Sequence, residues 1–182
     1  MCVVLAVFMV KIGITTCKNL LYPNAYEDLV VKYANDNDLE HALIMAVIKT
    51  ESNFVEDSHS GVASVLMQLT DETARWIAKK MDIDPEKIDL NNPKDNIMLG
   101  CYYLRYLIDY YNGNIDVALA AYNGGMGNVD KWLKNKEYSE DGKNLTYIPF
   151  KETREYVKKV NIQREVYRKL LSRGEDIQLT TK

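Results

Sequence analysis

Glu51 is the residue of this chain whose position best suits acid catalysis. It closes a predicted helix whose middle is the apolar run from Ala42 to Ile48. A carboxyl group at the end of an apolar helix is poorly solvated, and desolvation raises its pKa by disfavouring the charged form. A carboxylic acid that stays protonated near neutral pH can donate a proton to a leaving oxygen. Glu51 could equally be a surface acid at a helix end, so its role depends on its partners.

Three further short segments could complete a site around Glu51. Each also has a purely structural interpretation: Leu66 and Met67 could be core residues, and Tyr156 could be one more tyrosine that packs between helices. Their joint occurrence, in this order, is much less expected by chance than any one of them. The four segments are Glu51-Ser52-Asn53-Phe54, Leu66-Met67-Gln68, Ala120-Ala121-Tyr122-Asn123-Gly124-Gly125 and Glu152-Thr153-Arg154-Glu155-Tyr156-Val157.

In this order the segments resemble the catalytic domain of soluble lytic transglycosylases, a lysozyme-like family. The resemblance runs from about Tyr22 to Lys169, which is most of the chain. It implies a mostly α-helical, lysozyme-like single domain with a glycan-binding groove. Between the four segments the resemblance is carried by Thr73-Ala74, Asn96, Gly100, Tyr103-Leu104, Val129 and Trp132.

The resemblance also implies a reaction. The family cleaves the β-1,4 bond between N-acetylmuramic acid and N-acetylglucosamine in peptidoglycan, without water, and leaves a 1,6-anhydromuramyl end. Glu51 matches the family's single acid and base, and Ser52 matches a neighbour that positions the carboxyl group or the substrate. The matches to residues that contact or surround the sugars are Met67, Gln68, Tyr122, Asn123 and Tyr156.

A single acid fits this reaction. Ordinary glycosidases use two carboxylates, one as acid and the other as base or nucleophile. The resemblance implies that the 2-acetamido group of the substrate takes the place of the second carboxylate. Glu51 would protonate the glycosidic oxygen and then accept the proton of the muramyl C6 hydroxyl.

One segment departs from the family pattern. A glycine usually precedes L-M-Q, and Val65 stands at that position here. A β-branched side chain excludes most of the backbone conformations that glycine allows. We expect the 58–65 loop to lie beside Glu51 and Val65 to narrow or reroute the wall of the groove.

Two other functions remain open on the sequence. A hydrolytic muramidase that inverts the sugar needs a second carboxylate with room for a water molecule. Glu56, Asp57 and Asp71 are the nearby candidates. A catalytically weakened glycan-binding wall protein is the other alternative, and the retention of Glu51 with Gln68 argues against it.

The elements that must position these residues are predicted to be helices. Apolar residues recur at helical spacing, and no run alternates long enough to predict a strand. Thr70 and the acids after it indicate a helix start, and Gly124-Gly125 indicates a helix end. The predicted helices span residues 26–35, 39–53, 70–81, 96–111, 115–122, 129–133 and 153–171.

Bulk composition limits the remaining possibilities. The chain has 182 residues, is 47% hydrophobic and carries a net charge of −3, which suits one globular domain. The absence of a basic excess argues against nucleic-acid binding. Three cysteines and two histidines without metal-binding spacing predict no metal site and no cofactor, and Cys101 is expected in the core. Thirteen tyrosines against three phenylalanines suit a sugar-binding groove.

The two ends are expected to lie outside the folded domain. Residues 1–20 are apolar but short for a membrane span and lack a basic start, which indicates a degenerate export signal or membrane anchor. We expect the domain over residues 21–172 and a C-terminal tail over residues 173–182. The chain is predicted to be a monomer outside the cytoplasm, at the cell wall or membrane, where peptidoglycan strands are its partner.

Overall fold

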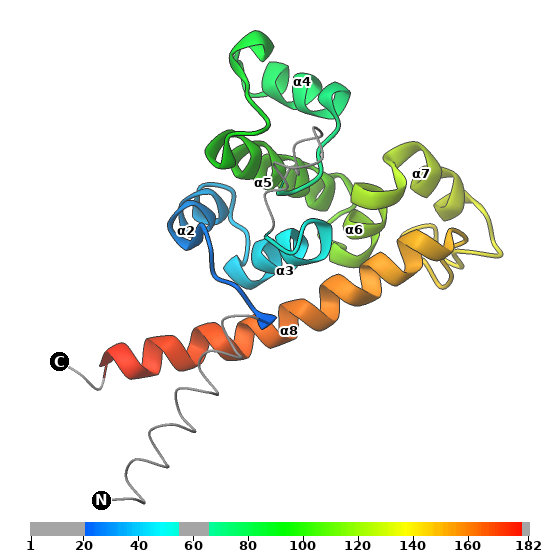
Figure 1. The fold of residues 1–182 in the computed structure, drawn as a ribbon. Helices are drawn as coiled ribbons and strands as arrows, with labels where there is room; N and C mark the ends of the chain where they lie inside the picture. Colours follow the sequence, from blue (N-terminus) through cyan, green and yellow to red (C-terminus); the bar gives the residue numbers. More distant parts are fainter. Residues whose placement is uncertain (1–20, 55–65, 180–182) are drawn as a thin grey trace, which may run out of the picture.

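The computed structural model describes residues 21–54 and 66–179, and every regular element within these ranges is a helix. Figure 1 shows the helices gathered along one side of the long C-terminal helix. The mostly α-helical fold predicted from the sequence is confirmed. The elements are α2 (Glu27–Asp36), α3 (His41–Glu51), α4 (Asp71–Lys80), the 3-10 helix η1 (Pro85–Lys87), α5 (Pro93–Tyr110), α6 (Ile115–Gly124), α7 (Met126–Lys134) and α8 (Lys151–Leu179).

Helix α3 lies at the centre of the core. All seven residues from Ala42 to Ile48 are buried, because α3 is covered by α8 on one side and by α2 on another. A helix that is apolar all round needs such cover. Helix α6 packs on α5, α7 and α8, while α4 and η1 form a separate projection that rests on α5. Helix α8 is therefore the main support of α3.

Capping residues fix several helix ends. The Thr70 side chain accepts a hydrogen bond from Thr73 N at 3.2 Å, so α4 starts where the sequence indicated. After α5 the chain turns at Gly113, whose φ is +85° and whose N–H donates to Ile108 O at 2.8 Å. Such a turn satisfies a carbonyl group that the helix end leaves free, and glycine adopts it without steric cost.

Three predicted boundaries were wrong by three residues or more, and one of them is the start of α7, which begins at Met126 rather than at Val129. Helix α5 begins at Pro93 rather than at Asn96, because the Asn92 side chain caps it and proline suits the first helical position. Helix α8 begins at Lys151 and continues to Leu179, past the predicted end at Leu171. The residues after Leu171 are mostly polar, so they lack the apolar periodicity on which the boundary was placed. A polar stretch of sequence gives no such signal, whatever its conformation.

Two glycines allow close contact between elements. A side chain at Gly100 of α5 would place its Cβ 2.2 Å from Met67 Sδ. A side chain at Gly124 of α6 would place its Cβ 2.9 Å from Thr153 Oγ1 of α8. Both glycines belong to the family-like pattern in the sequence. They bring the 66–68 segment onto α5 and the end of α6 onto α8.

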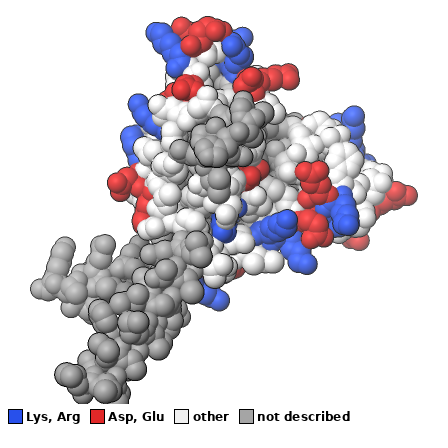
Figure 2. All heavy atoms as spheres, viewed as in Figure 1, with Lys and Arg blue, Asp and Glu red and all other residues white. Residues whose placement is uncertain are grey.

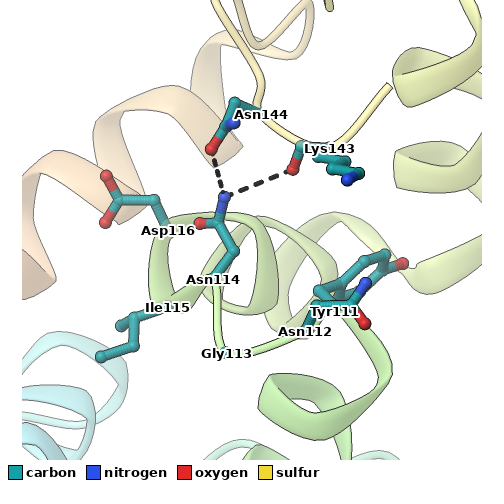
Figure 3. Close-up of a pocket in the computed structure, with 8 residues that line it drawn as sticks. All are labelled: Tyr111, Asn112, Gly113, Asn114, Ile115, Asp116, Lys143 and Asn144. Atoms are coloured by element: carbon teal, nitrogen blue, oxygen red, sulfur yellow. Dashed lines mark hydrogen bonds between the residues drawn. The ribbon is translucent and has the colours of Figure 1, made fainter. Parts of the chain in front are cut away.

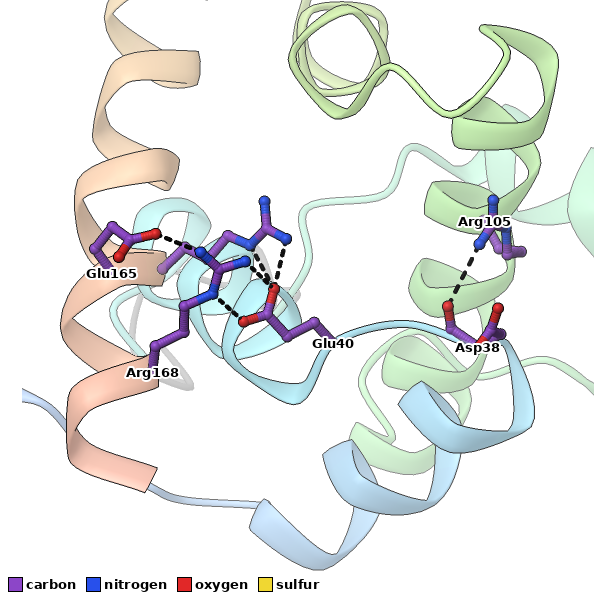
Figure 4. A network of polar contacts seen from close by, with 6 residues as sticks. Asp38, Glu40, Arg105, Glu165 and Arg168 are labelled. Atoms are coloured by element: carbon purple, nitrogen blue, oxygen red, sulfur yellow. Dashed lines mark hydrogen bonds and ion pairs between the residues drawn. The ribbon is translucent and has the colours of Figure 1, made fainter. Parts of the chain in front are cut away.

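An ionic network ties the start of α3 to α8 (Figure 4). The Glu40 carboxylate accepts hydrogen bonds from Arg164 Nε at 2.6 Å and from Arg168 Nη2 at 2.8 Å, and Arg168 also contacts Glu165. Partial burial opposes the charge on Glu40, but the bonds from Arg168 and Arg164 outweigh burial and lower its pKa. The network holds α3 and α8 in register at the end opposite Glu51.

Glu40→Gln is expected to destabilise the protein by about 1–3 kcal/mol at pH 7, because it leaves a largely buried Arg164 without its carboxylate. The lowered pKa of Glu40 means that the stabilisation is present at neutral pH and is lost as pH falls through the folded pKa. Urea unfolding at pH 7 and at pH 3 measures both effects. Glu165→Gln is the matched control, and an equal loss in the two variants would contradict the assignment.

Charged side chains are mixed over the surface. Figure 2 shows basic and acidic side chains side by side on the face it presents, with broad uncharged areas between them. Such a surface keeps a slightly acidic protein free of large single-sign fields.

Candidate active site

Helix α3 stops abruptly after Glu51. Ser52 Oγ donates to Ile48 O at 3.1 Å and accepts a hydrogen bond from Phe54 N at 3.2 Å. Asn53 and Phe54 then adopt left-handed conformations, with φ values of 54° and 61°. Ser52 therefore supports the turn that leaves the Glu51 carboxyl group in the last helical turn.

Burial of the Phe54 side chain stabilises the left-handed turn at Asn53 and Phe54. Left-handed backbone at a bulky residue such as Phe54 is unfavourable and persists only where the surroundings enforce it. The Phe54 side chain is buried and its ring centroid lies 6.4 Å from that of Tyr167 on α8. Strain of this kind is common at functional sites.

Burial dominates the electrostatics of Glu51. Burial raises the pKa of Glu51 to about 7, hydrogen bonding to Tyr156 partly opposes the rise, and the negative charge of Glu152 adds to it. The position of Glu51 at the C-terminal end of α3 acts in the same direction, since a helix dipole disfavours anions there. A large fraction of Glu51 is therefore protonated at neutral pH.

Two tyrosines lie beside the Glu51 carboxyl group. Tyr122 of α6 is partly buried and Tyr156 of α8 is buried. Burial raises the pKa values of both phenols, and the nearby charge of Glu51 raises them further. Both hydroxyl groups stay protonated and can donate hydrogen bonds. In this structure Tyr156 Oη nevertheless has no hydrogen-bond partner within ordinary geometry, so the bond to the Glu51 carboxyl group is not formed. Catalytic hydrogen bonds of a free enzyme often tighten only when substrate binds.

The 66–68 segment is anchored beside these tyrosines through its backbone. Tyr122 Oη donates to Met67 O at 2.8 Å, and Met67 N donates to Asn96 Oδ1 at 2.9 Å. The Asn96 side chain is fully buried and also donates to Leu90 O at 3.1 Å. Both polar backbone groups of Met67 are thereby fixed, one to α6 and the other to α5.

Met67 is a structural residue rather than a residue of the site surface. Its side chain is fully buried against Gly100. In this conformation the side chain has a packing role, and its contact with a sugar stays a prediction. The sequence could not separate the two, because an L-M pair suits a core as well as a groove.

Gln68 and Asn123 lie next to the bonded pair Met67 and Tyr122. Gln68 is exposed and has a left-handed φ of 48°, and Asn123 is half-buried at the end of α6. Neither side chain forms a hydrogen bond with another residue of the described part. Each amide carries both a donor and an acceptor, so both are available to a ligand. The contact of each with sugar stays a prediction.

Comparison with known proteins identifies this arrangement. The family described as "Transglycosylase SLT domain" matches residues 28–145 of the chain. The chain belongs to the transglycosylase SLT domain family. The "Soluble lytic murein transglycosylase" of Salmonella typhimurium is 35% identical over 158 residues, which cover 85% of this chain and 24% of that protein. The "Membrane-bound lytic murein transglycosylase C" of Yersinia enterocolitica is 32% identical and aligns with 79% of this chain and 47% of its own length.

A solved structure supports the same assignment. The X-ray structure of an inactive mutant of the lytic transglycosylase Slt from Pseudomonas aeruginosa superposes with a TM-score of 0.71 at 33% identity. It aligns with 85% of this chain and 26% of the Pseudomonas chain. The SLT domain chain thus spans about a quarter of the length of the soluble relatives reported above.

The structure adds one carboxylate to the SLT site that sequence reasoning missed. Glu152 stands one helical turn before Tyr156 on α8, so the two side chains share a face, and its charge acts on Glu51. The i, i+4 spacing to Tyr156 was the available signal. Asp71 is exposed in the first turn of α4 and has no such effect on Glu51, while Glu56, Asp57 and Val65 lie outside the described residues.

A surface pocket of about 540 Å³ lies elsewhere on the SLT domain (Figure 3). It is formed where the α5–α6 turn meets the loop before α8, and Asn114 Nδ2 donates there to Asn144 Oδ1 at 2.7 Å and to Lys143 O at 3.3 Å. None of the predicted site residues lines it. The pocket is therefore separate from the Glu51 site.

Asn96→Ala is expected to destabilise the SLT domain and to release the 66–68 segment. The change leaves Met67 N and Leu90 O without their partner, at roughly 1–3 kcal/mol for each buried group left unpaired. Urea unfolding measures the loss, with the exposed neighbour Asn91→Ala as the control. An Asn96→Ala protein as stable as the Asn91→Ala protein would show that the anchor is not needed.

Proposed function

We propose that this chain is a peptidoglycan lytic transglycosylase that cleaves the β-1,4 bond between N-acetylmuramic acid and N-acetylglucosamine and forms 1,6-anhydromuramyl ends. The observation that carries the proposal is Glu51, a carboxyl group with a pKa of about 7 in a site built from the family motifs. Membership of the SLT family supports the choice of substrate.

Glu51 acts first as an acid in the proposed reaction. Its proton passes to the glycosidic oxygen as the bond to C1 of the muramyl residue breaks, and the 2-acetamido group of the substrate stabilises the cationic centre. The C6 hydroxyl oxygen then bonds to C1, and its proton passes to the Glu51 carboxylate. One bond is broken, one is formed, and Glu51 ends as it began.

Tyr156 stabilises the intermediate state of this cycle. Between the two steps Glu51 is a carboxylate in a desolvated site, where a charge without a hydrogen-bond donor is costly. The protonated Tyr156 hydroxyl lies beside the Glu51 carboxylate and lowers the pKa of Glu51, which means that it stabilises the charged form. A small movement of either side chain would complete the hydrogen bond.

A muramidase that hydrolyses the same bond is the alternative. Glu152 is the residue that favours it, because it is the carboxylate of the described part whose charge acts on Glu51. A hydrolase would use this second carboxylate to activate water. A catalytically weakened glycan-binding wall protein is the third possibility, and a protonated, desolvated Glu51 gives such a protein no benefit.

Mass analysis of the digestion products separates these functions. Purified peptidoglycan treated with the protein is expected to yield muropeptides with anhydro ends, each one water lighter than a hydrolysis product. Reducing ends would overturn the transglycosylase proposal in favour of the muramidase. A digest without soluble products would favour the binding protein.

We also propose a location outside the cytoplasm, at the cell wall or membrane. Related proteins are described both as soluble and as membrane-bound, and the proposed substrate is the wall. Within residues 21–54 and 66–179 no helix is long and apolar enough to cross a membrane. The predicted anchor or signal at residues 1–20 lies outside the described residues. Fractionation of cells that carry the chain with and without residues 1–20 tests its role.

A further inference from the structure

Aromatic rings form a continuous row along α4 and α5, which we call the aromatic strip. It consists of Trp76 from α4 and of Tyr103, Tyr106 and Tyr110 from α5. The three tyrosines are three and four residues apart, so they share one face of α5. Seven residues of helix separate the first from the last, which gives the strip a length of about 10 Å along α5.

The outer part of the strip is exposed. Trp76 is 37% exposed and Tyr110 is 49% exposed, while Tyr103 is buried at the inner end. Large aromatic side chains are usually covered, so a group of them at the surface marks a binding area. Only Tyr103 of the strip is among the residues that carry the family-like pattern of the sequence.

Contacts between the rings hold the strip in place. The ring centroid of Trp76 lies 5.0 Å from that of Tyr106 and 6.1 Å from that of Tyr103, both edge to face. Tyr106 and Tyr110 are stacked at 6.3 Å. Rings that are already fixed lose little conformational entropy when a ligand binds.

The inner end of the strip meets the Glu51 site. The centroids of Tyr103 and Tyr122 are 5.3 Å apart, and Tyr122 is one of the two tyrosines beside Glu51. The strip therefore leads from the proposed catalytic centre outward along α5. A polymer that is cut at Glu51 must continue beyond the site, and the strip offers it a continuous path.

Polar groups contact the strip at two places, and one of them, Lys80, lies over the rings. Lys80 Nζ lies 4.9 Å from the Trp76 ring centroid and 5.0 Å from that of Tyr106. At the outer end of the strip the Asp130 carboxylate accepts hydrogen bonds from Tyr110 Oη at 3.2 Å and from Tyr111 Oη at 3.0 Å. Flat apolar faces bordered by hydrogen-bonding groups suit sugars, which present C–H faces and hydroxyl groups.

We infer that the aromatic strip binds the glycan strand of peptidoglycan outside the Glu51 site, with sugar rings packed on Trp76, Tyr106 and Tyr110. The inference rests on the proposed function for the identity of the polymer. The Lys80 ammonium suits the carboxylates carried by peptide stems of that polymer. The strip thereby favours long strands over short fragments.

Binding to a protein that cannot cleave tests this inference. Glu51→Gln is the parent, and its affinity is measured by calorimetry for long peptide-free glycan strands and for a short oligosaccharide from the same strands. Adding Trp76→Ala or Tyr110→Ala is expected to weaken binding of long strands by about tenfold and to leave the short ligand unaffected. Trp76→Phe retains a ring and is expected to restore part of the affinity.

Tyr147→Ala provides the matched control, because Tyr147 is as exposed as Tyr110 but lies in the loop before α8. Thermal unfolding of each variant separates loss of binding from loss of folding. Unchanged affinity for long strands in both strip variants overturns the inference, and so does an equal loss for the short ligand. Self-association that disappears in Trp76→Ala also overturns it, since the strip would then join two copies. The assay reads binding only, so it remains decisive if Glu51 proves not to be the acid.

Discussion

Glu51→Gln is expected to lower the rate of peptidoglycan cleavage by about 10²–10⁴-fold or more while the protein stays folded. Glutamine keeps the shape of the side chain but can neither donate nor accept the catalytic proton. Among the described residues, neither Tyr122 nor Tyr156 can replace Glu51 as the acid, because their raised pKa values keep their protons bound. Release of soluble muropeptides from purified peptidoglycan measures the rate.

The same variant is expected to be more stable than the parent at pH 7 and above. The folded protein raises the pKa of Glu51 from 4.5 to about 7, so the native state binds a proton that the unfolded state has lost. Stability from this group is full below the unfolded pKa and falls as pH rises through the folded pKa. Glutamine has no proton to lose in this pH range, so the Glu51→Gln protein does not lose stability in this way. Thermal unfolding at pH 4 and pH 8 should show a clear gain at pH 8 and little or none at pH 4, which lies below the unfolded pKa.

Glu155→Gln, an exposed neighbour on α8, is the control for both measurements. Retained cleavage in the Glu51→Gln protein would exclude Glu51 as the acid, whatever its pKa. A loss of stability at pH 8 would show that the Glu51 carboxylate has a partner that compensates its burial.

The sequence predicted the parts of this protein that depend on local patterns. Continuous apolar character from Ala42 to Ile48 required cover on all sides, and α3 has it. The Thr70 cap and the glycines after Tyr122 fixed helix ends, because such signals act within a few residues. The position of Glu51 at the end of an apolar helix predicted its raised pKa for the reason that the structure shows, namely desolvation.

The sequence could not predict what depends on side-chain direction across the fold. Met67 points inward because Gly100 leaves room for it, and that contact joins residues far apart in the chain. Glu152 acts on Glu51 only because α8 lies against α3. The length of α8 was underestimated, since its last turns carry no apolar pattern.

The rate of cleavage is expected to fall by about tenfold for each pH unit above about 7, because Glu51 must carry a proton to act as the acid. The groups that set this pKa can be tested separately. Burial is the largest influence, Tyr156 lowers the pKa, and Glu152 raises it. The pH dependence of kcat/KM reports the pKa in the free enzyme.

Two variants should therefore move the alkaline limb of this profile in opposite directions. Glu152→Gln removes a negative charge, lowers the pKa of Glu51 and shifts the limb to lower pH. Tyr156→Phe removes a hydrogen-bond donor to the carboxylate, raises the pKa and shifts the limb to higher pH. The Glu152 effect is largest at low ionic strength, since salt screens an exposed charge, whereas the Tyr156 effect is insensitive to salt because the hydroxyl is buried. Shifts in the same direction, or a limb that neither variant moves, would mean that a group other than Glu51 limits cleavage at alkaline pH.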